Sequence, residues 1–311
     1  MAAMSHFDGR VLSANTGLFA VECKDGTALQ CRCATRLRNE KRSVKPGDLV
    51  SGQDNGDGTG FITGVKERLN DFIRPSVCNV DMLAVIVSAT TPAPQLYNID
   101  KQTALAAING VKCCVVVNKC DEKRIPDRSE LYGPDARDID RIYTLAGYRV
   151  FCVSAHTGEG IDELRGYLLG RFTAFSGASG AGKSSLLNAL YGSCRARVGD
   201  ISERIRRGKN TTRITELFCV ERGTYIADTP GFTMLDLVNF DIIPFARITE
   251  AFPDLAEYMH GCRYRDCTHT GEEGCALSAA AAEGLVSPER IGSYIKMYGE
   301  LKSKKTYRQK E

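Results

Sequence analysis

A glycine-rich segment near the middle of the chain has the residues and spacing of a phosphate-binding loop. It reads Gly177-Ala178-Ser179-Gly180-Ala181-Gly182-Lys183-Ser184 and matches the pattern G-x-x-x-x-G-K-[ST] in full. Glycines let the backbone curl so that successive N–H groups and a helix N-terminus face phosphate oxygens. We expect Lys183 to reach the β- and γ-phosphates of a nucleotide, Ser184 to ligate Mg²⁺, and Ser185 to complete the nucleotide-binding segment.

A second motif selects the base. Asn118, Lys119 and Asp121 form the pattern N-K-x-D directly after an expected strand at residues 113–117. The Asp121 carboxylate, an acceptor only, can take two hydrogen bonds from guanine N1–H and its 2-amino group, and adenine offers no such pair. Ligands of open α/β sheets bind at the carboxyl ends of strands, which is where this motif lies. The sequence therefore predicts GTP and GDP as ligands and disfavours an ATPase.

Two shorter motifs extend the nucleotide site. Ser154-Ala155 follows an expected strand at residues 149–153 and resembles the S-A motif, whose backbone amide meets guanine O6. Asp228 and Gly231 begin and end a D-x-x-G motif after an expected strand at residues 225–227. We expect Asp228 to hold Mg²⁺ through water and the Gly231 amide to sense the γ-phosphate.

The segment between the phosphate loop and D-x-x-G carries a candidate switch threonine. We favour Thr212 over Thr211 as the residue that completes the Mg²⁺ shell. In Ras-like proteins N-K-x-D and S-A follow D-x-x-G, whereas here they precede the phosphate loop, which predicts a circularly permuted GTPase domain. The segment after Gly231 then runs into the C-terminal region, so that nucleotide state could move that region directly. Phe232 stands where Ras-like enzymes carry the glutamine that orients water, so the catalytic group stays open.

Three cysteines and a histidine cluster near the C-terminus. Cys262, Cys267, His269 and Cys275 have the spacing C-x4-C-x-H-x5-C. Three thiolates and one imidazole suit tetrahedral Zn²⁺, and four protein ligands leave no open position for chemistry. We therefore expect one structural zinc ion that holds a small helical domain together. His260 lies close by in the sequence and is an alternative, less well spaced ligand.

The elements that must position these residues change character along the chain. Short runs of strand-forming residues, broken by turn residues, predict five strands at residues 11–12, 18–23, 28–34, 49–51 and 61–65. Five short strands in some sixty residues favour a small closed barrel of the OB type. Arg74-Pro75 is typical of a linker, because proline biases its predecessor toward extended backbone.

Beyond that linker, strands and helices alternate, which predicts a mostly parallel sheet covered by helices. The expected strands are residues 82–87, 113–117, 149–153 and 173–175, the expected helices 100–109, 160–169 and 184–191, and a hairpin spans residues 216–227. From about residue 238 the pattern is helical. The predicted domains are an OB-fold RNA-binding domain at residues 1–70, a circularly permuted P-loop GTPase domain at 71–236 and a helical zinc-binding domain at 237–311.

The composition of the chain limits where the protein can act and which partners it can bind. Of 311 residues 43% are apolar, and no apolar run approaches the roughly eighteen residues of a membrane helix. The first ten residues lack the apolar core of a signal peptide, so we expect a cytoplasmic protein with no membrane partner and with reduced thiols. Net charge is only +3, yet basic residues cluster at 36–45, 204–209 and 302–310. Arg36, Arg38, Lys41 and Arg42 on a barrel favour an RNA partner.

The combination of these motifs resembles the RsgA family, bacterial circularly permuted GTPases that assist maturation of the small ribosomal subunit. The resemblance rests on the permuted motif order, the barrel before it and the cysteine and histidine cluster after it. It implies binding to the small subunit, one zinc ion and GTP hydrolysis that the subunit stimulates. The family commonly has histidine before the threonine pair, where this chain has Asn210, which can bind water but cannot act as a base near neutral pH.

Two functions remain open at this point. The leading one is an enzyme, expected to act as a monomer, that hydrolyses GTP, binds the small ribosomal subunit through its rRNA and couples hydrolysis to release during late maturation. The alternative is a nucleotide-gated RNA-binding or scaffold protein with negligible turnover.

Overall fold

The structure is a computed structural model that describes residues 5–35, 43–73, 75–124, 133–192, 217–228 and 243–308, with the backbone alone at residues 228 and 304–308. The described residues belong to two compact units. The first comprises Met1–Met82, Arg165–Phe175 and Tyr191–Gly231, and the second comprises Leu83–Leu164, Ser176–Leu190 and Phe232–Glu311.

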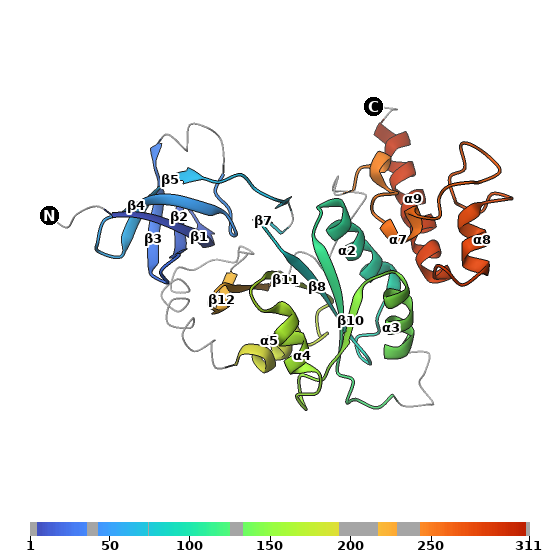
Figure 1. The fold of residues 1–311 in the computed structure, drawn as a ribbon, viewed down its shortest axis with the longest axis horizontal. Coiled ribbons are helices and arrows are strands. Elements are labelled where there is room, and N and C mark those ends of the chain that lie inside the picture. Colours follow the sequence, from blue (N-terminus) through green and yellow to red (C-terminus); the bar gives the residue numbers. More distant parts are fainter. Residues whose placement is uncertain are drawn as a thin grey trace. The chain divides into compact units, whose positions relative to one another are not determined.

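The N-terminal strands close into a barrel, drawn in blue in Figure 1. They are β1 (Ser5–Asn15), β2 (Leu18–Cys23), β3 (Ala28–Cys33), β4 (Leu49–Asp54) and β5 (Thr59–Val65), in the order β1-β2-β3-β5-β4. β3 and β5 run parallel, and the other recorded pairs are antiparallel. Alternate residues point inward, as a barrel wall requires, so that Val11, Val21 and Ile62 are almost fully buried. The predicted five-stranded barrel is confirmed, with longer first, fourth and fifth strands than the sequence indicated.

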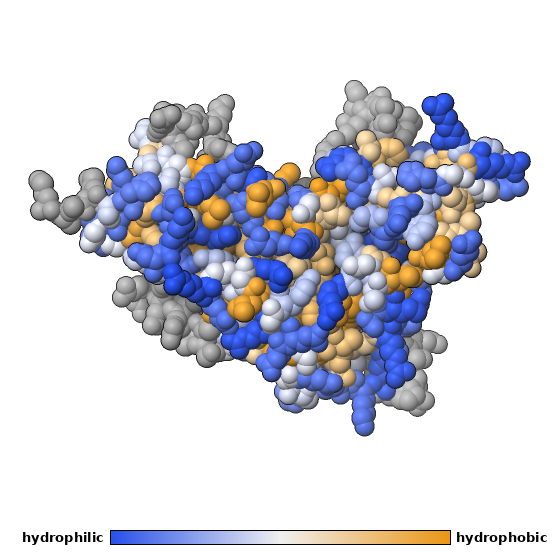
Figure 2. All heavy atoms as spheres, in the orientation of Figure 1, coloured by the Kyte–Doolittle hydropathy of each residue, from blue (hydrophilic) through white to orange (hydrophobic). Residues whose placement is uncertain are grey.

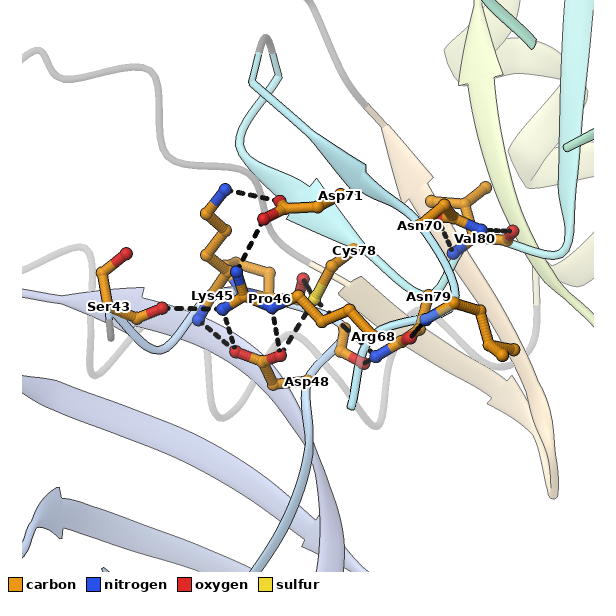
Figure 3. A network of polar contacts seen from close by, with 12 residues as sticks. Ser43, Lys45, Pro46, Asp48, Arg68, Asn70, Asp71, Cys78, Asn79 and Val80 are labelled. Carbon is orange, nitrogen blue, oxygen red and sulfur yellow. Dashed lines mark hydrogen bonds and ion pairs between the residues drawn. The ribbon is translucent and has the colours of Figure 1, made fainter. Parts of the chain in front are cut away.

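A buried carboxylate joins the barrel to the segment that follows it (Figure 3). Asp48, fully buried, accepts hydrogen bonds from Arg68 Nε at 2.7 Å and Nη2 at 2.8 Å and from the Lys45 backbone N–H at 2.8 Å. The Cys78 thiol lies 3.2 Å from the same carboxylate, and Arg68 also binds Asp71 at 2.7 Å. The short hairpin β6 (Asp71–Phe72) and β7 (Val77–Cys78) is thereby attached to residues 45–48, directly before β4. The sequence did not predict this hairpin.

The central sheet has six strands in the order β10-β9-β8-β11-β13-β12. They are β8 (Met82–Ser88), β9 (Lys112–Asn118), β10 (Arg149–Cys152), β11 (Phe172–Ser176), β12 (Leu217–Glu221) and β13 (Thr224–Asp228). Every residue of β8 and β11 is buried, which is the pattern of a sheet with both faces covered. β10 pairs with β9 and β11 with β13 in parallel, whereas β12 pairs with β13 as an antiparallel hairpin. The predicted mostly parallel sheet is confirmed.

Helices connect these strands and form the C-terminal region. They are α2 (Leu96–Ile108), α3 (Ala136–Leu145), α4 (Ile161–Leu168), α5 (Lys183–Tyr191), the 3-10 turn η3 (Phe245–Arg247), α7 (Pro253–Ala256), α8 (Ala276–Ala282) and α9 (Pro288–Arg308). Phe252, Leu277, Tyr294 and Met297 form a buried core for the C-terminal helices, and Ala104 of α2 packs into it. The second unit therefore joins the helices after residue 243 to the sheet through α2 (Figure 1).

The surface carries mixed polarity. Figure 2 shows hydrophilic residues over much of the drawn face, with apolar residues in small areas among them. Among the described helices, none combines the length and the apolar character needed to cross a bilayer. The predicted domain boundaries near residues 70 and 236 remain predictions. Arg36, Arg38, Lys41 and Arg42 lie outside the described residues.

Candidate GTP site and zinc centre

The phosphate loop lies where its motif predicts, between a strand and a helix. β11 ends at Ser176 and α5 begins at Lys183. Gly177, Gly180 and Gly182 have φ of 137°, 83° and 90°, a backbone region that residues other than glycine rarely adopt. Lys183 Nζ lies 2.7 Å from Gly177 O and 2.9 Å from Ala178 O, so its ammonium group already sits over the loop. The arrangement can present backbone N–H groups and one cation to phosphate oxygens.

Asn118 connects the phosphate loop to the S-A motif. Its side chain, in a residue only 1% exposed, donates from Nδ2 to Ala181 O at 3.1 Å. Its Oδ1 accepts from the Ala155 N–H at 3.1 Å. One amide group therefore joins three loops that are separated along the chain. Since the Ala155 N–H already has this partner, its predicted bond to guanine O6 stays a prediction.

Asp121 is positioned by Ser154. The Ser154 hydroxyl donates a hydrogen bond to the Asp121 carboxylate, and this bond is the main reason that the pKa of Asp121 lies below its usual value. The electrostatic effect of the nearby His156 side chain also lowers the pKa of Asp121. Ser154 Oγ in turn accepts from the N–H groups of His156 at 3.2 Å and Thr157 at 3.0 Å. Asp121 is exposed and ionised near neutral pH, and can accept two hydrogen bonds from one ligand edge.

These loops enclose a pocket of about 510 Å³. It is lined by Asn118, Lys119, Asp121, Glu122, Ala155, His156, Gly182 and Ser185. Lys119 has φ of 65°, and its Nζ donates to Thr91 O at 2.5 Å, which extends the apolar side-chain stem along the pocket wall. A pocket of this size that adjoins a phosphate loop accommodates a nucleotide base.

The structure adds residues that the sequence did not single out. Glu122 lines the pocket and accepts a hydrogen bond from the Thr90 hydroxyl. Gln102 of α2 is bonded to the Ser176 hydroxyl, directly before the phosphate loop. No motif marks these contacts, because each joins residues that are far apart in the chain.

Several predicted residues fall outside the described part of the chain. Asn210, Thr211, Thr212, Gly231 and Phe232 belong to this group. Asp228 is the last residue of β13, one residue beyond the end of the predicted strand, and its backbone alone is described. Ser184 is exposed as the second residue of α5, whereas Thr212 is not among the described residues, and both stay predictions as Mg²⁺ ligands.

Gly182→Ala should weaken nucleotide binding by about tenfold or more. A Cβ at this position would lie 2.3 Å from Asn118 Nδ2, so the Asn118 side chain would lose its position between the two loops. Titration of the purified variant with a fluorescent GDP analogue measures the effect.

Gly180→Ala is the matched control. It has a similar φ of 83°, yet its Cβ would meet only the Pro92 ring, with Cδ nearest at 3.4 Å. The two variants share the backbone strain and differ in the displacement of Asn118. Equal losses in both would mean that strain alone, and not Asn118, governs binding.

The predicted zinc ligands meet in the C-terminal region. Cys262, Cys267, His269 and Cys275 bring their four ligand atoms within 4.8 Å of one another. His269 Nδ1 lies 3.6 Å from Cys262 Sγ and 3.5 Å from Cys275 Sγ. A tetrahedral zinc ion with ordinary bond lengths would separate sulfur and nitrogen ligands by about 3.5–3.6 Å. The donor set and spacing therefore fit one zinc ion with no open coordination position.

Glu272 holds the loop that carries these ligands. Its carboxylate accepts from the Thr268 hydroxyl at 2.5 Å and from the N–H groups of Thr268 and Thr270, each at 2.8 Å. These hydrogen bonds, led by the one from the hydroxyl, lower the pKa of Glu272 to about 2. Tyr294 of α9 donates to Thr268 O at 3.1 Å and so attaches the loop to the helical core.

His269→Ala should reduce bound zinc from about one ion per chain to near zero after dialysis against a weak chelator. The variant loses one of four ligands, and the C-terminal helices should lose thermal stability with it. Elemental analysis and circular dichroism measure both.

His260→Ala is the control for this prediction. His260 is absent from the ligand cluster of the described residues, so the variant should keep its zinc. Loss of zinc in His260→Ala with retention in His269→Ala would reverse the assignment of the ligands.

The fold and the site together define a class. A P-loop between β11 and α5, an N-K-x-D motif after β9, and the reversed order of the two along the chain are the features of a circularly permuted GTP-binding protein. The model of the family described as RsgA GTPase matches residues 65–238. The chain belongs to the RsgA GTPase family.

Individual relatives match nearly the whole chain. A small ribosomal subunit biogenesis GTPase RsgA from Caldanaerobacter subterraneus subsp. tengcongensis is 32% identical over 99% of this chain and 100% of its own length. One of the same name from Moorella thermoacetica is 35% identical over 94% and 97%. Among solved structures, YjeQ from Thermotoga maritima matches with a TM-score of 0.78 and 29% identity, covering 96% of this chain and 99% of its own. YloQ, described as a circularly permuted GTPase, matches with a TM-score of 0.77.

Proposed function

We propose that this chain is a GTP hydrolase that binds the small ribosomal subunit and assists its late maturation, with hydrolysis coupled to release. The observation that carries the proposal is the pocket beside the phosphate loop, in which Asp121 is held by Ser154. The names of relatives that match nearly the whole chain support the ribosomal role. The barrel, as a common platform for single-stranded nucleic acid, supports contact with rRNA. The protein acts as a monomer in the cytoplasm.

In this proposal the phosphate loop binds the phosphates of the nucleotide. The N–H groups of residues 177–185 and the Lys183 ammonium group hold the β- and γ-phosphates. Ser184 and Thr212 hold Mg²⁺, Asp228 does so through water, and the Gly231 amide contacts the γ-phosphate. Mg²⁺, when bound, neutralises charge that develops between these phosphates. The domains at residues 1–70, 71–236 and 237–311 supply RNA binding, the nucleotide site and the zinc module.

Unaided hydrolysis should be slow. Phe232 replaces the glutamine that orients water in Ras-like enzymes, and a phenyl ring offers no hydrogen bond. Asn210 can bind the attacking water but cannot take its proton near neutral pH. A group from the ribosomal subunit therefore completes the catalytic arrangement.

The test is steady-state GTP hydrolysis by the purified protein, alone and with small subunits, large subunits or whole ribosomes. We expect a low basal rate that small subunits raise selectively. Lys183→Ala should lower the stimulated rate by about a hundredfold or more, because it removes a cation that stabilises the developing phosphate charge.

The second function, a nucleotide-gated RNA-binding or scaffold protein, predicts a different result. GTP would bind with ordinary affinity, and no ribosomal particle would raise turnover. That outcome, with the Lys183→Ala variant indistinguishable from the parent in hydrolysis, would replace the enzymatic proposal.

A further inference from the structure

Two cysteines lie next to the N-K-x-D and S-A motifs that border the nucleotide pocket. Cys120 occupies the variable position of N-K-x-D, between Lys119 and Asp121. Cys152 is the last residue of β10, two positions before Ser154. The parallel register pairs Cys152 with Val117 at the end of β9, and the Cys120 N–H donates to Val153 O at 3.1 Å. Residues 120 and 152 are therefore neighbours across the two strand ends, and their side chains interact.

Their surroundings differ from those of the thiols in the barrel. Cys23 and Cys31 are buried, and burial raises their pKa to about 11 and about 12. Cys152 is exposed and Cys120 is half-buried. The interaction with Cys120 lowers the pKa of Cys152, and the interaction with Cys152 raises the pKa of Cys120. Cys152 is therefore the accessible thiol of the pair and the better nucleophile, with a second thiol on the neighbouring strand end.

We propose that Cys120 and Cys152 form a reversible disulfide that weakens guanine-nucleotide binding. The oxidant is a peroxide. The Cys152 thiolate attacks one peroxide oxygen, the O–O bond breaks, and the cysteine becomes a sulfenic acid while a proton converts the leaving oxygen to water. The Cys120 thiol then attacks the Cys152 sulfur, its proton leaves with the hydroxyl group as a second water, and an S–S bond forms. Two thiols and one hydrogen peroxide thus give one disulfide and two waters.

The disulfide would act on the residues that recognise the base. The Cys120 thiol now donates to Val117 O at 3.2 Å, a contact that bond formation removes. Lys119, the preceding residue, sits at φ of 65° with its ammonium group on Thr91 O, so it has little freedom to absorb a shift. A movement of Cys120 toward β10 therefore displaces Asp121 from its bond with Ser154. Loss of a charged hydrogen bond to guanine corresponds to a decrease in affinity of about tenfold to a hundredfold.

The experiment uses the full-length protein with its zinc content measured before and after treatment. The reduced protein is titrated with a fluorescent GDP analogue, exposed to hydrogen peroxide, titrated again, and titrated a third time after dithiothreitol. Peptide mass spectrometry under non-reducing conditions maps the disulfides. Cys152→Ser is the test variant, and Cys219→Ser, which removes a half-buried thiol on β12, is the matched control.

We expect a Cys120–Cys152 peptide to appear, affinity to fall about tenfold or more, and dithiothreitol to restore it in the parent and in Cys219→Ser. Cys152→Ser should keep its affinity through the same treatment. Equal affinity of the reduced and disulfide-bonded forms would overturn the inference. An affinity loss in Cys152→Ser that accompanies zinc release would also overturn the inference, because oxidation of the zinc ligands would then explain the effect. The absence of the mapped peptide would overturn it as well.

The inference rests on the proposed binding of guanine nucleotide by this pocket. The experiment distinguishes failure of the proposed function from failure of the disulfide inference. Reduced protein that does not bind GDP contradicts the proposed function, whereas the mapped peptide still decides whether the thiols pair. Reduced protein that binds GDP and is insensitive to disulfide formation contradicts the inference alone.

Discussion

Asp121→Asn should weaken GTP binding by about a hundredfold or more and create binding of xanthosine triphosphate. The carboxylate accepts hydrogen bonds from two guanine donors, and hydrogen bonds to charged groups are stronger than neutral ones. An asparagine amide presents its own N–H donors to the guanine 2-amino group, so one bond is lost and a repulsive contact replaces it. Xanthine carries an oxygen at that position, which the amide can donate to. Calorimetric titration with both nucleotides measures the exchange.

Glu122→Gln is the matched control for the change in charge. Glu122 lines the same pocket and is adjacent in the chain, but its carboxylate is bonded to the Thr90 hydroxyl. We expect its GTP affinity to change by less than about threefold. If Glu122→Gln lost as much affinity as Asp121→Asn, the effect would come from the general charge of the pocket. Retained GTP affinity in Asp121→Asn would contradict base recognition by this motif.

Arg290→Met should lower the free energy of unfolding of the second unit by about 3–5 kcal/mol. Arg290 is fully buried on α9, where its Nη1 lies 2.6 Å from Asp100 of α2 and its Nη2 lies 2.6 Å from Asp254 of α7. Its guanidinium carbon also lies 4.9 Å from the centre of the Phe252 ring. Methionine fills similar space but leaves the fully buried Asp100 and the partly buried Asp254 without their cation.

Arg149→Met controls for the loss of an ion pair as such. The pair of Arg149 with Glu163 is exposed, with side chains 59% and 63% accessible, and such pairs contribute less than about 1 kcal/mol. Urea denaturation followed by circular dichroism, together with zinc release to a chromogenic chelator, reports on the helices after residue 243. Similar decreases in the free energy of unfolding in Arg149→Met and Arg290→Met would show that burial does not make the Arg290 ion pairs more important for stability.

Helix α2 contacts both Arg290 and the residue before the phosphate loop. Asp100 and Thr103, which bind Arg290, flank Gln102 on α2, and Gln102 is bonded to Ser176 before the phosphate loop. A weaker nucleotide affinity in folded Arg290→Met than in Arg149→Met would indicate energetic coupling between the C-terminal helices and the loop.

The sequence by itself determined the motifs whose geometry is local. The glycine-rich loop, N-K-x-D and the C-x4-C-x-H-x5-C spacing could be recognised because each is a short segment in which neighbouring residues act together. The barrel was predictable for a related reason, since alternating strands and turn residues are local patterns. The length of β1 and the β6–β7 hairpin were missed, because strand ends and two-residue strands depend on the partner strand more than on their own residues.

Tertiary structure alone decided which distant residues meet. Asn118 reaches Ala155 and Ala181 because β9, β10 and the phosphate loop end at the same edge of the second unit. The contact of Cys120 with Cys152 follows from the register of β9 and β10, and the Arg290 cluster from the packing of α9 on α2. No local pattern encodes these contacts, because the energy of each depends on burial and orientation that exist only after the strands and helices have packed.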